Sequence, residues 1–393
     1  MTPAARTQAA IDLLDAVIEA ARSGGAAADT VAQRFFAARR YAGSKDRRAI
    51  RGLVYEAIRS FGERPANGRA AMVALARGRP ELADCFDGTG YGPAPIQAGE
   101  PEAEAALAPA WLIEAFAASG LDTNEVAALL ERAPVDVRVN RLKADRASVQ
   151  AEIGGEPLAF APDALRLPTD APVEPLPAWR EGRIEVQDAG SQIVGSLAGA
   201  EPGMCVVDLC AGGGGKTLSL AATMENRGRI VASDTDRARL SRLPERAARA
   251  GVTIAETRLL DPKREAEGLA DLHGSADIVL IDAPCSATGT WRRNPEARWR
   301  LTPERLARFA EVQSRLLDVA AELVRPGGAL TYVVCSLLDA EGRDQVAAFL
   351  SRHPGWSAAP SEATVGRWHG DGRRLTPAHD GTDGFFVARL VRA

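Results

Sequence analysis

The spacing of apolar positions changes near residue 203 and divides the chain into a helical part and a strand-rich part. Between residues 7 and 77, apolar side chains recur every three or four positions without strand-like alternation. One apolar stripe follows Asp46, which can serve as a helix N-cap, and continues to Ile58. The pattern predicts an α-helical N-terminal domain over residues 1–78.

The stretch between these parts carries weaker signals. Residues 79–109 contain Gly-Thr-Gly-Tyr-Gly-Pro-Ala-Pro and an acidic run, and are predicted to form a linker or long loop. Residues 110–195 combine helical spacing with the strand-like run Val135–Val139 and predict a small α+β subdomain. Residues 196–393 are predicted to form one larger domain.

From Gly203 onward, apolar runs of strand length alternate with helical stretches. A long helix is predicted over Pro303–Val324, because apolar residues recur there at helical spacing and proline suits the first turn. The predicted strands are Met204–Leu209, Arg229–Ser233, Ala276–Ile281 and Ala329–Val334. Such alternation, with nearly continuous apolar strands, predicts an α/β domain with a mostly parallel, doubly wound sheet covered on both faces.

Four consecutive glycines follow the first predicted strand and open a helix, within the segment Asp208–Thr217. In doubly wound folds, the loop at this position binds a cofactor. A phosphate-binding Walker A loop would need glycine at position 210, where the chain has cysteine. A dinucleotide fingerprint would need glycine or alanine at position 217 or 218, where the chain has threonine and leucine. Neither pattern is met.

S-adenosylmethionine is the third ligand that such a loop can hold. Its site needs an acidic residue before the glycines and a second one after the next strand, to bind the ribose hydroxyls. Asp208 and Asp234 occupy these positions, and Asp261 is placed to receive the adenine amino group. The alternative is that all three are loop and cap residues, but their succession after the predicted strands favours a cofactor site.

Two cysteines, Cys285 and Cys335, follow the third and fourth predicted strands. Both therefore leave the carboxyl ends of parallel strands, where ligands bind. Cys205 and Cys210 lie in or beside the first strand and are interpreted as packing residues. The pair at the strand exits is a sharper signal than a lone cysteine.

A pyrimidine C5 is too electron-poor to attack a methyl sulfonium unaided. A thiolate that adds to C6 turns C5 into a carbon nucleophile, which is covalent catalysis. Asp282 precedes Cys285 in Asp-Ala-Pro-Cys and can hydrogen-bond the base edge. Methyltransferases that act on amino groups usually carry Asn/Asp-Pro-Pro-Tyr here, so the segment favours carbon chemistry.

Net charge and composition do not by themselves indicate an RNA-binding protein. The 393 residues are 46% hydrophobic with a net charge of −4, so an RNA affinity would need local basic patches. The segment from Arg34 to Arg59 contains eight basic and two acidic residues, and Trp291–Arg300 contains four arginines and two tryptophans. Either segment could contact RNA phosphates and unpaired bases, or could be a solvated surface.

The cysteine and histidine content gives no sign of a metal site or of secretion. None of the five cysteines forms a Cys-x-x-Cys pair, and only four histidines accompany them, so no metal is expected. We find neither a secretory signal nor an apolar run long enough to cross a membrane. The expected location is the cytoplasm, and no membrane partner is expected.

The segments around the two cysteines resemble those of the bacterial Sun/RsmB family of S-adenosylmethionine-dependent RNA cytosine-C5 methyltransferases. Residues 282–289, Asp-Ala-Pro-Cys-Ser-Ala-Thr-Gly, are highly specific for this family, and Tyr332–Ser336 resembles its Tyr-x-Thr-Cys-Ser. The family's usual Ala-Ala-Pro-Gly-Gly-Lys is replaced by Ala211-Gly-Gly-Gly-Gly-Lys216. Further segments that resemble the family are Asp46–Arg59, Arg138–Lys143, Gln187–Gln192 and Thr382–Phe386.

The resemblance implies a class I methyltransferase fold, Rossmann-like, with an N-terminal NusB-like RNA-binding domain. It implies that Cys335 attacks C6, that Cys285 helps to release the methylated RNA, and that Asp282 and Lys216 lie at the cytosine ring. The residues implied for the cofactor site are Asp208, Cys210, Ala211, Gly212, Gly213, Gly214, Gly215, Lys216, Asp234, Asp261 and Asp282. The candidates for RNA contact are Arg138, Asn140, Lys143, Arg292 and Arg293.

The predicted function is therefore methyl transfer from S-adenosylmethionine to C5 of a cytosine in RNA, with 16S ribosomal RNA as the expected target. A flipped or single-stranded base is expected, because a ring carbon cannot be reached inside a stacked helix. Three alternatives remain open at this point. They are a tRNA cytosine-C5 methyltransferase, a non-catalytic RNA-binding or ribosome-assembly protein, and a P-loop ATPase.

Overall fold

The computed structural model describes residues 1–359 and 365–393. The chain divides into two compact units. The first, here called the helical unit, comprises Met1–Glu131 and Thr290–Pro303, and the second, the sheet unit, comprises Arg132–Gly289 and Glu304–Ala393. These divisions differ from the boundaries expected at residues 78, 109 and 195.

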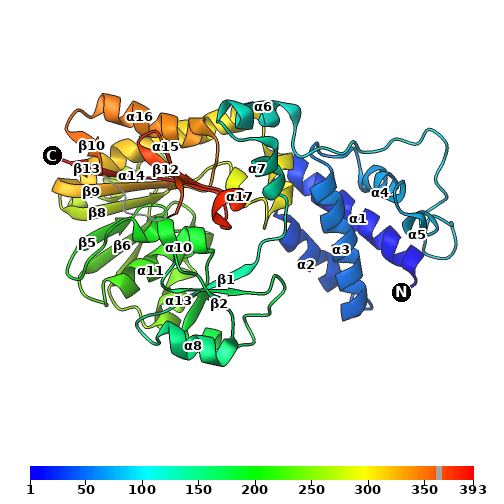
Figure 1. Ribbon diagram of the computed structural model, residues 1–393, viewed down its shortest axis with the longest axis horizontal. Coiled ribbons are helices and arrows are strands. Elements are labelled where there is room, and N and C mark those ends of the chain that lie inside the picture. The colour runs from blue at the N-terminus through cyan, green and yellow to red at the C-terminus, as the bar shows by residue number, and fades with distance from the viewer. Residues whose placement is uncertain (360–364) are drawn as a thin grey trace. The chain divides into compact units, whose positions relative to one another are not determined.

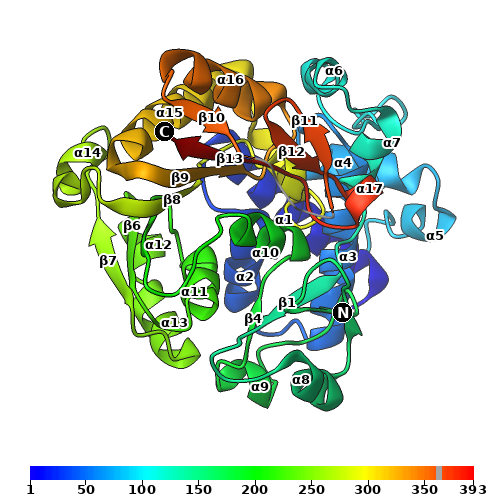
Figure 2. The ribbon, with the colours of Figure 1, turned by 60° about the vertical axis from the view of Figure 1, so that its left-hand side comes forward.

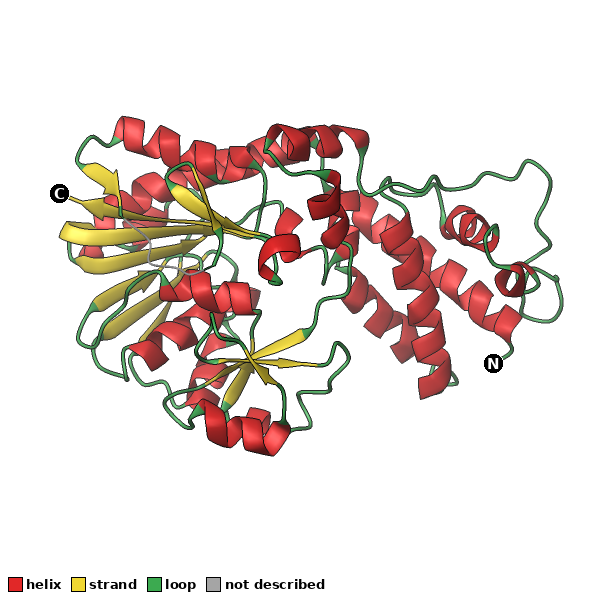
Figure 3. Cartoon of the chain, viewed as in Figure 1, coloured by secondary structure: helices red, strands yellow, loops and turns green. Residues whose placement is uncertain are grey.

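The helical unit contains helices and no strands within residues 1–131, all of which are described (Figure 3). Its α-helices are α1 (Pro3–Arg22), α2 (Ala28–Ala38), α3 (Ser44–Ser60), α4 (Gly68–Ala76), α5 (Pro80–Ala83), α6 (Ala110–Ala118) and α7 (Thr123–Ala128). The expected N-cap at Asp46 is wrong, because α3 begins at Ser44 and Asp46 lies in its first turn. There Asp46 accepts a hydrogen bond from Arg6 Nε at 2.7 Å.

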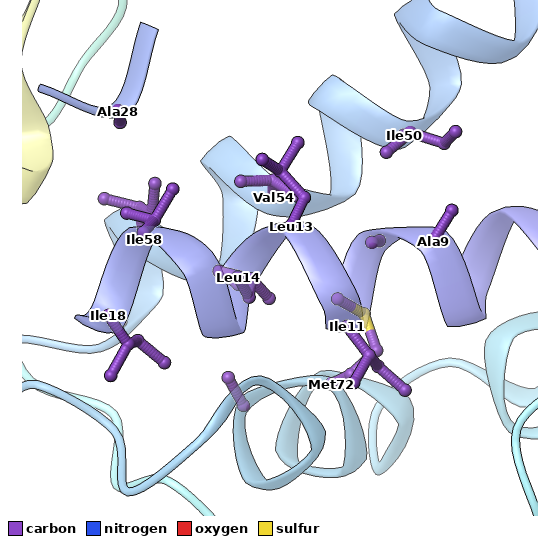
Figure 4. Packing of buried hydrophobic residues seen from close by; sticks show 14 of the residues in the cluster. Ala9, Ile11, Leu13, Leu14, Ile18, Ala28, Ile50, Val54, Ile58 and Met72 are labelled. Carbon is purple, nitrogen blue, oxygen red and sulfur yellow. The ribbon is translucent and has the colours of Figure 1, made fainter. Parts of the chain in front are cut away.

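The core of the helical unit forms where α1 packs against α3 and α4 (Figure 4). Leu13 and Leu14 of α1 are fully buried, as Ile58 of α3 and Met72 of α4 are. The stripe that the sequence predicts from Ile50 to Ile58 therefore points into this core. Burial of each such side chain contributes about 1.5–3 kcal/mol, so apolar packing determines the arrangement of these short helices.

A small antiparallel sheet opens the sheet unit, with strand order β2-β3-β1-β4. The predicted strand Val135–Val139 is confirmed as β1. The other strands are β2 (Glu156–Pro157), β3 (Ala164–Leu167) and β4 (Ile184–Val186), with α8 (Arg146–Ile153) and α9 (Pro177–Arg180) between them.

The large sheet has the strand order β11-β12-β13-β9-β8-β5-β6-β7 (Figure 1). Its parallel strands are β5 (Cys205–Asp208), β6 (Arg229–Asp234), β7 (Ala255–Leu259), β8 (Ala276–Asp282) and β9 (Val324–Val334). The antiparallel strands are β10 (Trp356–Ala358), β11 (Arg367–His369), β12 (Gly372–Leu375) and β13 (Phe385–Arg392). The predicted mostly parallel sheet is confirmed.

Helices cover both faces of this sheet (Figure 2). One face packs on α10 (Ala189–Ser196), α11 (Gly215–Thr223), α12 (Arg237–Leu240) and α13 (Leu243–Ala250). The other packs on α14 (Glu265–Gly268), α15 (Pro303–Leu323) and α16 (Arg343–Arg352). The short helix α17 (Pro377–Asp380) precedes β13.

The position of β5 determines where a ligand can bind in this fold. β5 pairs with β6 on one side and with β8 on the other, so the strand order reverses at β5. Ligands of doubly wound sheets bind at the carboxyl ends of the strands at such a reversal. In the described residues, no helix is long and apolar enough to cross a membrane.

Candidate active site

The glycine loop joins β5 to α11 and needs glycine for two separate reasons. Gly212 and Gly214 have φ values of 54° and 85°, in the left-handed region that side chains rarely adopt. A Cβ at Gly214 would lie 2.1 Å from Leu243 Cδ1, so α13 packs where a side chain would be. At Gly212 and Gly215, in contrast, a Cβ would meet no atom within 4 Å. The loop therefore packs on the protein at Gly214 and faces open space at Gly212 and Gly215.

The predicted cofactor acids take three different positions. Asp234 is half-buried and accepts hydrogen bonds from the backbone N–H of Gly212 at 2.8 Å and of Asp236 at 2.7 Å. Asp208 is fully buried behind the loop, where the Thr217 hydroxyl donates to it at 2.6 Å. Asp261 is exposed just beyond β7. Asp234 and Asp261 are thus accessible to a ligand, whereas Asp208 braces the loop from inside.

Lys216 and Asp282 form an ion pair between the start of α11 and the end of β8. Lys216 Nζ lies 2.5 Å from Asp282 Oδ2, and the Lys216 side chain is buried while that of Asp282 is about one-third exposed. Burial, the largest single effect, works to lower the pKa of Lys216, but the charge and hydrogen bond of Asp282, together with the charges of Cys335 and Asp208, raise it above its usual value. A fixed ammonium group therefore lies at the exit of the strand that leads to Cys285.

Cys285 and Cys335 come together although fifty residues separate them. Their Sγ atoms lie 3.4 Å apart, both side chains are half-buried, and neither forms a disulfide. The backbone holds this approach, since Gly289 N donates to the Cys335 carbonyl at 2.9 Å. Gly289 also contacts Gly384 so closely that a Cβ at Gly289 would lie 2.1 Å from the Gly384 carbonyl oxygen.

The environment of Cys285 favours its neutral thiol. Its hydrogen bond with Cys335 is the largest cause of a pKa well above the usual value, followed by burial and by the charges of Cys335 and Glu341. Burial likewise raises the pKa of Cys210, whose half-buried side chain packs against the core. Cys210 and Ala211 begin the glycine loop after β5. The backbone N–H of Ala211 donates to the Ser233 carbonyl at 3.0 Å.

The residues proposed for RNA contact on the small sheet have partners inside the sheet unit. Arg138 and Asn140 are buried, and Arg138 Nε donates to Gln187 at 2.7 Å. The Asn140 amide donates to the carbonyls of Gly182 and Ala250, both at 2.8 Å. Lys143 Nζ donates to the carbonyls of Glu181 and Arg249 at 2.9 Å and 2.6 Å. Asn140 and Lys143 thereby connect the small sheet to α13, and contact of these residues with RNA stays a prediction.

Arg292 and Arg293 belong to the helical unit and follow the Cys285 loop in the chain. Arg292 is buried and Arg293 half-buried, and Trp291 beside them is fully buried against Phe116. The Arg292 carbonyl accepts a hydrogen bond from Arg59. Much of this arginine- and tryptophan-rich segment is therefore core rather than open surface, and RNA contact by Arg292 and Arg293 also stays a prediction.

Two features of the site were missed from the sequence. Arg246 of α13 donates to the Gly213 carbonyl at 2.5 Å and pairs with Glu185 at 2.8 Å, which ties the glycine loop to β4. Glu341 is completely buried behind both cysteines and binds Ser286 and Ser336. The repeated Cys-Ser dipeptide places a serine next to each cysteine, but no pattern in the sequence links Glu341 to those serines.

The described residues contain no group of three or more His, Cys, Asp or Glu side chains placed to hold a metal ion. The site is thus made of a glycine loop, two accessible acids (Asp234 and Asp261), a lysine–aspartate pair and two adjacent thiols.

The chain is similar to known methyltransferases over most of its length. Residues 197–391 match the family model of the 16S rRNA methyltransferase RsmB/F. The ribosomal RNA small subunit methyltransferases B of Salmonella typhi and Salmonella paratyphi B are each 37% identical over 267 residues, which are 67% of this chain and 60% of theirs. The chain therefore matches about three-fifths of the length of these curated relatives.

Solved structures agree with the fold. The crystal structure of PH0851 is 26% identical, with a TM-score of 0.76 over 99% of both chains. The structure of NSun6 from Pyrococcus horikoshii with SFG is 22% identical, with a TM-score of 0.64 over 72% of this chain and 98% of that one. The resemblance drawn from the sequence is confirmed: through residues 197–391, the chain belongs to the RsmB/F family of 16S rRNA methyltransferases.

Proposed function

We propose that the protein transfers a methyl group from S-adenosylmethionine to C5 of a cytosine in 16S ribosomal RNA. The observation that carries the proposal is the pair of thiols, Cys285 and Cys335, 3.4 Å apart at the carboxyl ends of β8 and β9. Methylation of a pyrimidine carbon needs a nucleophile at C6 and a way to remove it afterwards. Two thiols within contact distance offer both.

Cys335 is the proposed nucleophile. Its thiolate adds to C6 of the cytosine, and the electrons of the C5–C6 double bond make C5 able to accept the methyl group. C5 takes the methyl group, and the electrons of the broken methyl–sulfur bond stay on the sulfonium sulfur, which becomes a neutral thioether. Water then accepts the C5 proton, the C–H electrons re-form the C5–C6 double bond, and the C6–S bond breaks with its electron pair returning to the Cys335 sulfur. Cys285 is held as a thiol beside Cys335 and assists this release.

The Lys216–Asp282 pair supports the first step. The Lys216 ammonium group is the positive charge expected near an attacking thiolate, and the charge of Cys335 contributes to the raised pKa of Lys216. The Asp282 side chain is exposed enough to hydrogen-bond the cytosine ring while its Oδ2 atom binds the Lys216 ammonium group. Substitution of either residue would leave its partner without the opposite charge that stabilises it.

The residues at the glycine loop fit S-adenosylmethionine, which supplies the methyl group on a sulfonium. Gly212 and Gly215 face open space, so a ligand can approach the backbone closely. Asp234 uses one lone pair on each oxygen for the backbone N–H groups of Gly212 and Asp236 and keeps further acceptor capacity for ribose hydroxyls. Asp261 is proposed to receive the adenine amino group.

The test is methylation of RNA by the purified protein and its two cysteine variants. Cys335→Ala is expected to abolish methyl transfer, because no thiol can attack C6. Cys285→Ala is expected to accumulate a covalent protein–RNA species, visible as a retarded band on a denaturing gel. Full activity of Cys335→Ala would refute the mechanism.

Bisulfite sequencing of total RNA from cells with and without the gene identifies the target. A cytosine in 16S rRNA that loses its protection from conversion supports the proposal. Loss at a tRNA cytosine would point to the tRNA enzyme instead, and no change at any site would favour a non-catalytic RNA-binding protein.

A further inference from the structure

A buried carboxylate lies directly behind the two cysteines. Glu341 is 0% exposed and belongs to the turn between Cys335 and α16. Ser286 follows Cys285, Ser336 follows Cys335, and both serines are buried as well. The three side chains meet although they come from the ends of two strands and from a separate turn.

One carboxylate binds both serines. Glu341 Oε1 accepts from the backbone N–H of Ser286 at 2.8 Å, and Oε2 accepts from the Ser286 hydroxyl. The same Oε2 accepts from the Ser336 hydroxyl at 2.5 Å, and the two hydroxyl oxygens are 3.1 Å apart. Each strand exit that carries a thiol is thereby fastened to the same group.

Glu341 is itself held in place from two other elements. Gln313 of α15 donates to Glu341 Oε1 at 3.1 Å and to the Pro284 carbonyl at 3.0 Å. The Tyr332 hydroxyl donates to the Glu341 backbone carbonyl at 2.6 Å. Because α15 and β9 both contribute, a shift of either cysteine loop would break several buried hydrogen bonds, each costly to leave unmade.

We propose that Glu341 is a positioning residue for the reaction, which sets the approach of the Cys285 and Cys335 thiols by holding Ser286 and Ser336 on one carboxylate. The role rests on the proposed function, since it concerns the same two thiols. Glu341 does not touch the reacting atoms and acts only through its neighbours.

The charge of Glu341 adds a second effect. Within the described residues, its hydrogen-bond partners are hydroxyls, a backbone N–H and an amide, and no cation pairs with it. Its negative charge is among the causes, after Cys335 and burial, that raise the pKa of Cys285. Removal of that charge is therefore expected to lower the pKa of Cys285, whereas a purely structural residue would not act on it in this direction.

Two substitutions of Glu341 separate the effect of its charge from the effect of its side-chain length. Glu341→Gln keeps the side-chain length but removes the charge, and Glu341→Asp keeps the charge but shortens the reach by one methylene. Glu125→Gln is the matched control, because Glu125 is a buried glutamate in the capping box of α7, where glutamine serves equally well. Ser286→Ala and Ser336→Ala are milder changes to the same network and stand in if the Glu341 variants do not fold.

The first readout is the pH dependence of iodoacetamide alkylation at Cys285 and Cys335, followed by mass spectrometry on the full chain. It needs no RNA and no methyl transfer. Glu341→Gln is expected to move the alkylation midpoint of Cys285 down by at least half a pH unit, whereas Glu341→Asp and the Glu125 control keep the wild-type midpoint. With the serine variants, the relative rates at the two thiols are expected to change at least threefold.

The second readout is single-turnover methylation. Both Glu341 variants are expected to lower the rate constant at least tenfold and to accumulate the covalent adduct, with the dissociation constants for RNA and S-adenosylmethionine within about twofold of wild type. A wild-type alkylation midpoint of Cys285 in folded Glu341→Gln, or wild-type relative rates at the two thiols in the folded serine variants, would overturn the proposal. If Glu341→Gln moves the profile but the wild-type protein methylates no RNA, the proposed function fails and the positioning role stands.

Discussion

Asp208 shows how burial changes a single acid at this site. Its side chain is fully buried at the end of β5, and burial raises the pKa of its carboxyl group to about 7. Oδ2 binds Thr217, whereas Oδ1 has no hydrogen-bond partner among the described residues. Between about pH 4 and pH 7, the unfolded chain has released the proton that the folded protein still binds. The free energy of unfolding therefore falls as the pH rises through this range.

Asp208→Asn is expected to reduce this pH dependence, because the amide is neutral at every pH and has nearly the same shape. Between pH 5 and pH 8, the free energy of unfolding of wild type should fall by roughly 2–3 kcal/mol more than that of the variant. Urea unfolding at both pH values measures the difference. Asp170→Asn is the control, since Asp170 is 85% exposed. An unchanged pH dependence in Asp208→Asn would show that Asp208 is ionised in the folded protein at pH 5.

Cys285, Cys335 and Glu341 show which residues of the site could be predicted from the sequence and which could not. Both cysteines could be predicted to lie together, because each follows an apolar run and parallel strands place their carboxyl ends at one edge. Glu341 could not, because it lies in a separate turn after Cys335, and only the folded chain brings its side chain onto Ser286 and Ser336. Hydrogen bonds between distant segments leave no periodic pattern.

At the scale of elements, neighbouring glycines of the glycine loop have different roles: Gly214 packs against the protein, whereas Gly215 faces open space where a ligand can bind. Gly214→Ala is expected to destabilise the protein by about 3 kcal/mol or more, since φ is 85° and Leu243 Cδ1 occupies the space of a Cβ. Gly215→Ala is the matched variant, because it begins α11 and a Cβ there meets no atom within 4 Å.

Thermal unfolding and S-adenosylmethionine binding distinguish the two alanine variants. Gly215→Ala should keep the wild-type melting temperature but weaken S-adenosylmethionine binding by about tenfold or more, roughly 1.4 kcal/mol. A stable Gly214→Ala, or a Gly215→Ala that binds normally, would contradict this division of the loop.

The segment Thr290–Pro303 illustrates an element whose role the sequence did not reveal. Within it, the sequence predicts either RNA contact or a solvated surface for Trp291–Arg300, and RNA contact stays a prediction. The structure adds a packing role, because the 3-10 helix Pro295–Arg300 packs on α1 and α3. Arg298 is completely buried, and its guanidinium group donates to the carbonyls of Ile58, Arg59 and Phe61 at the end of α3. An arginine that binds carbonyls and one that binds phosphates look alike in a sequence.

Arg298→Met is expected to destabilise the helical unit by roughly 3–5 kcal/mol, because it leaves buried carbonyls unsatisfied and removes a cation from a helix C-terminus. Hydrogen exchange of the amides near the end of α3 measures the effect in the full chain. Arg22→Met is the control, since Arg22 is about half exposed in α1. Unchanged protection of α3 in Arg298→Met would show that the segment is not needed to hold the helix.

At the scale of the whole molecule, the parallel strands of the large sheet could be predicted from the sequence more readily than the division into units. Apolar strands and their helices give periodic signals, so the predicted runs at Arg229–Ser233 and Ala276–Ile281 lie within β6 and β8. The division into units depends on which distant segments pack together. Thr290–Pro303 joins the helical unit although it lies within the sheet unit's sequence.

RNA affinity is a property of the whole chain that must overcome a net charge of −4. The basic stretch from Arg34 to Arg59 retains an exposed subset around Tyr41, whose side chain is 72% exposed. These exposed basic residues, on α2, α3 and the turn between them, are Arg34, Arg40, Lys45 and Arg48. Exposed cations and an exposed aromatic ring in one segment suit RNA phosphates and an unpaired base, so we expect this group to supply part of the salt-dependent affinity.

Replacement of Arg34, Arg40 and Arg48 by alanine is therefore expected to weaken RNA binding roughly 10- to 100-fold at low salt. The slope of log K against log salt should fall by about 2–3, because each lost phosphate contact removes roughly 0.7–0.9. Fluorescence anisotropy with a labelled 16S rRNA fragment measures both quantities between about 50 and 200 mM salt. Over this range, every two phosphate contacts change the affinity by roughly tenfold. The matched control replaces three exposed arginines that pair with glutamates, Arg22, Arg227 and Arg264. If the control lowers affinity and slope equally, only overall charge matters and the group around Tyr41 is no RNA-binding surface.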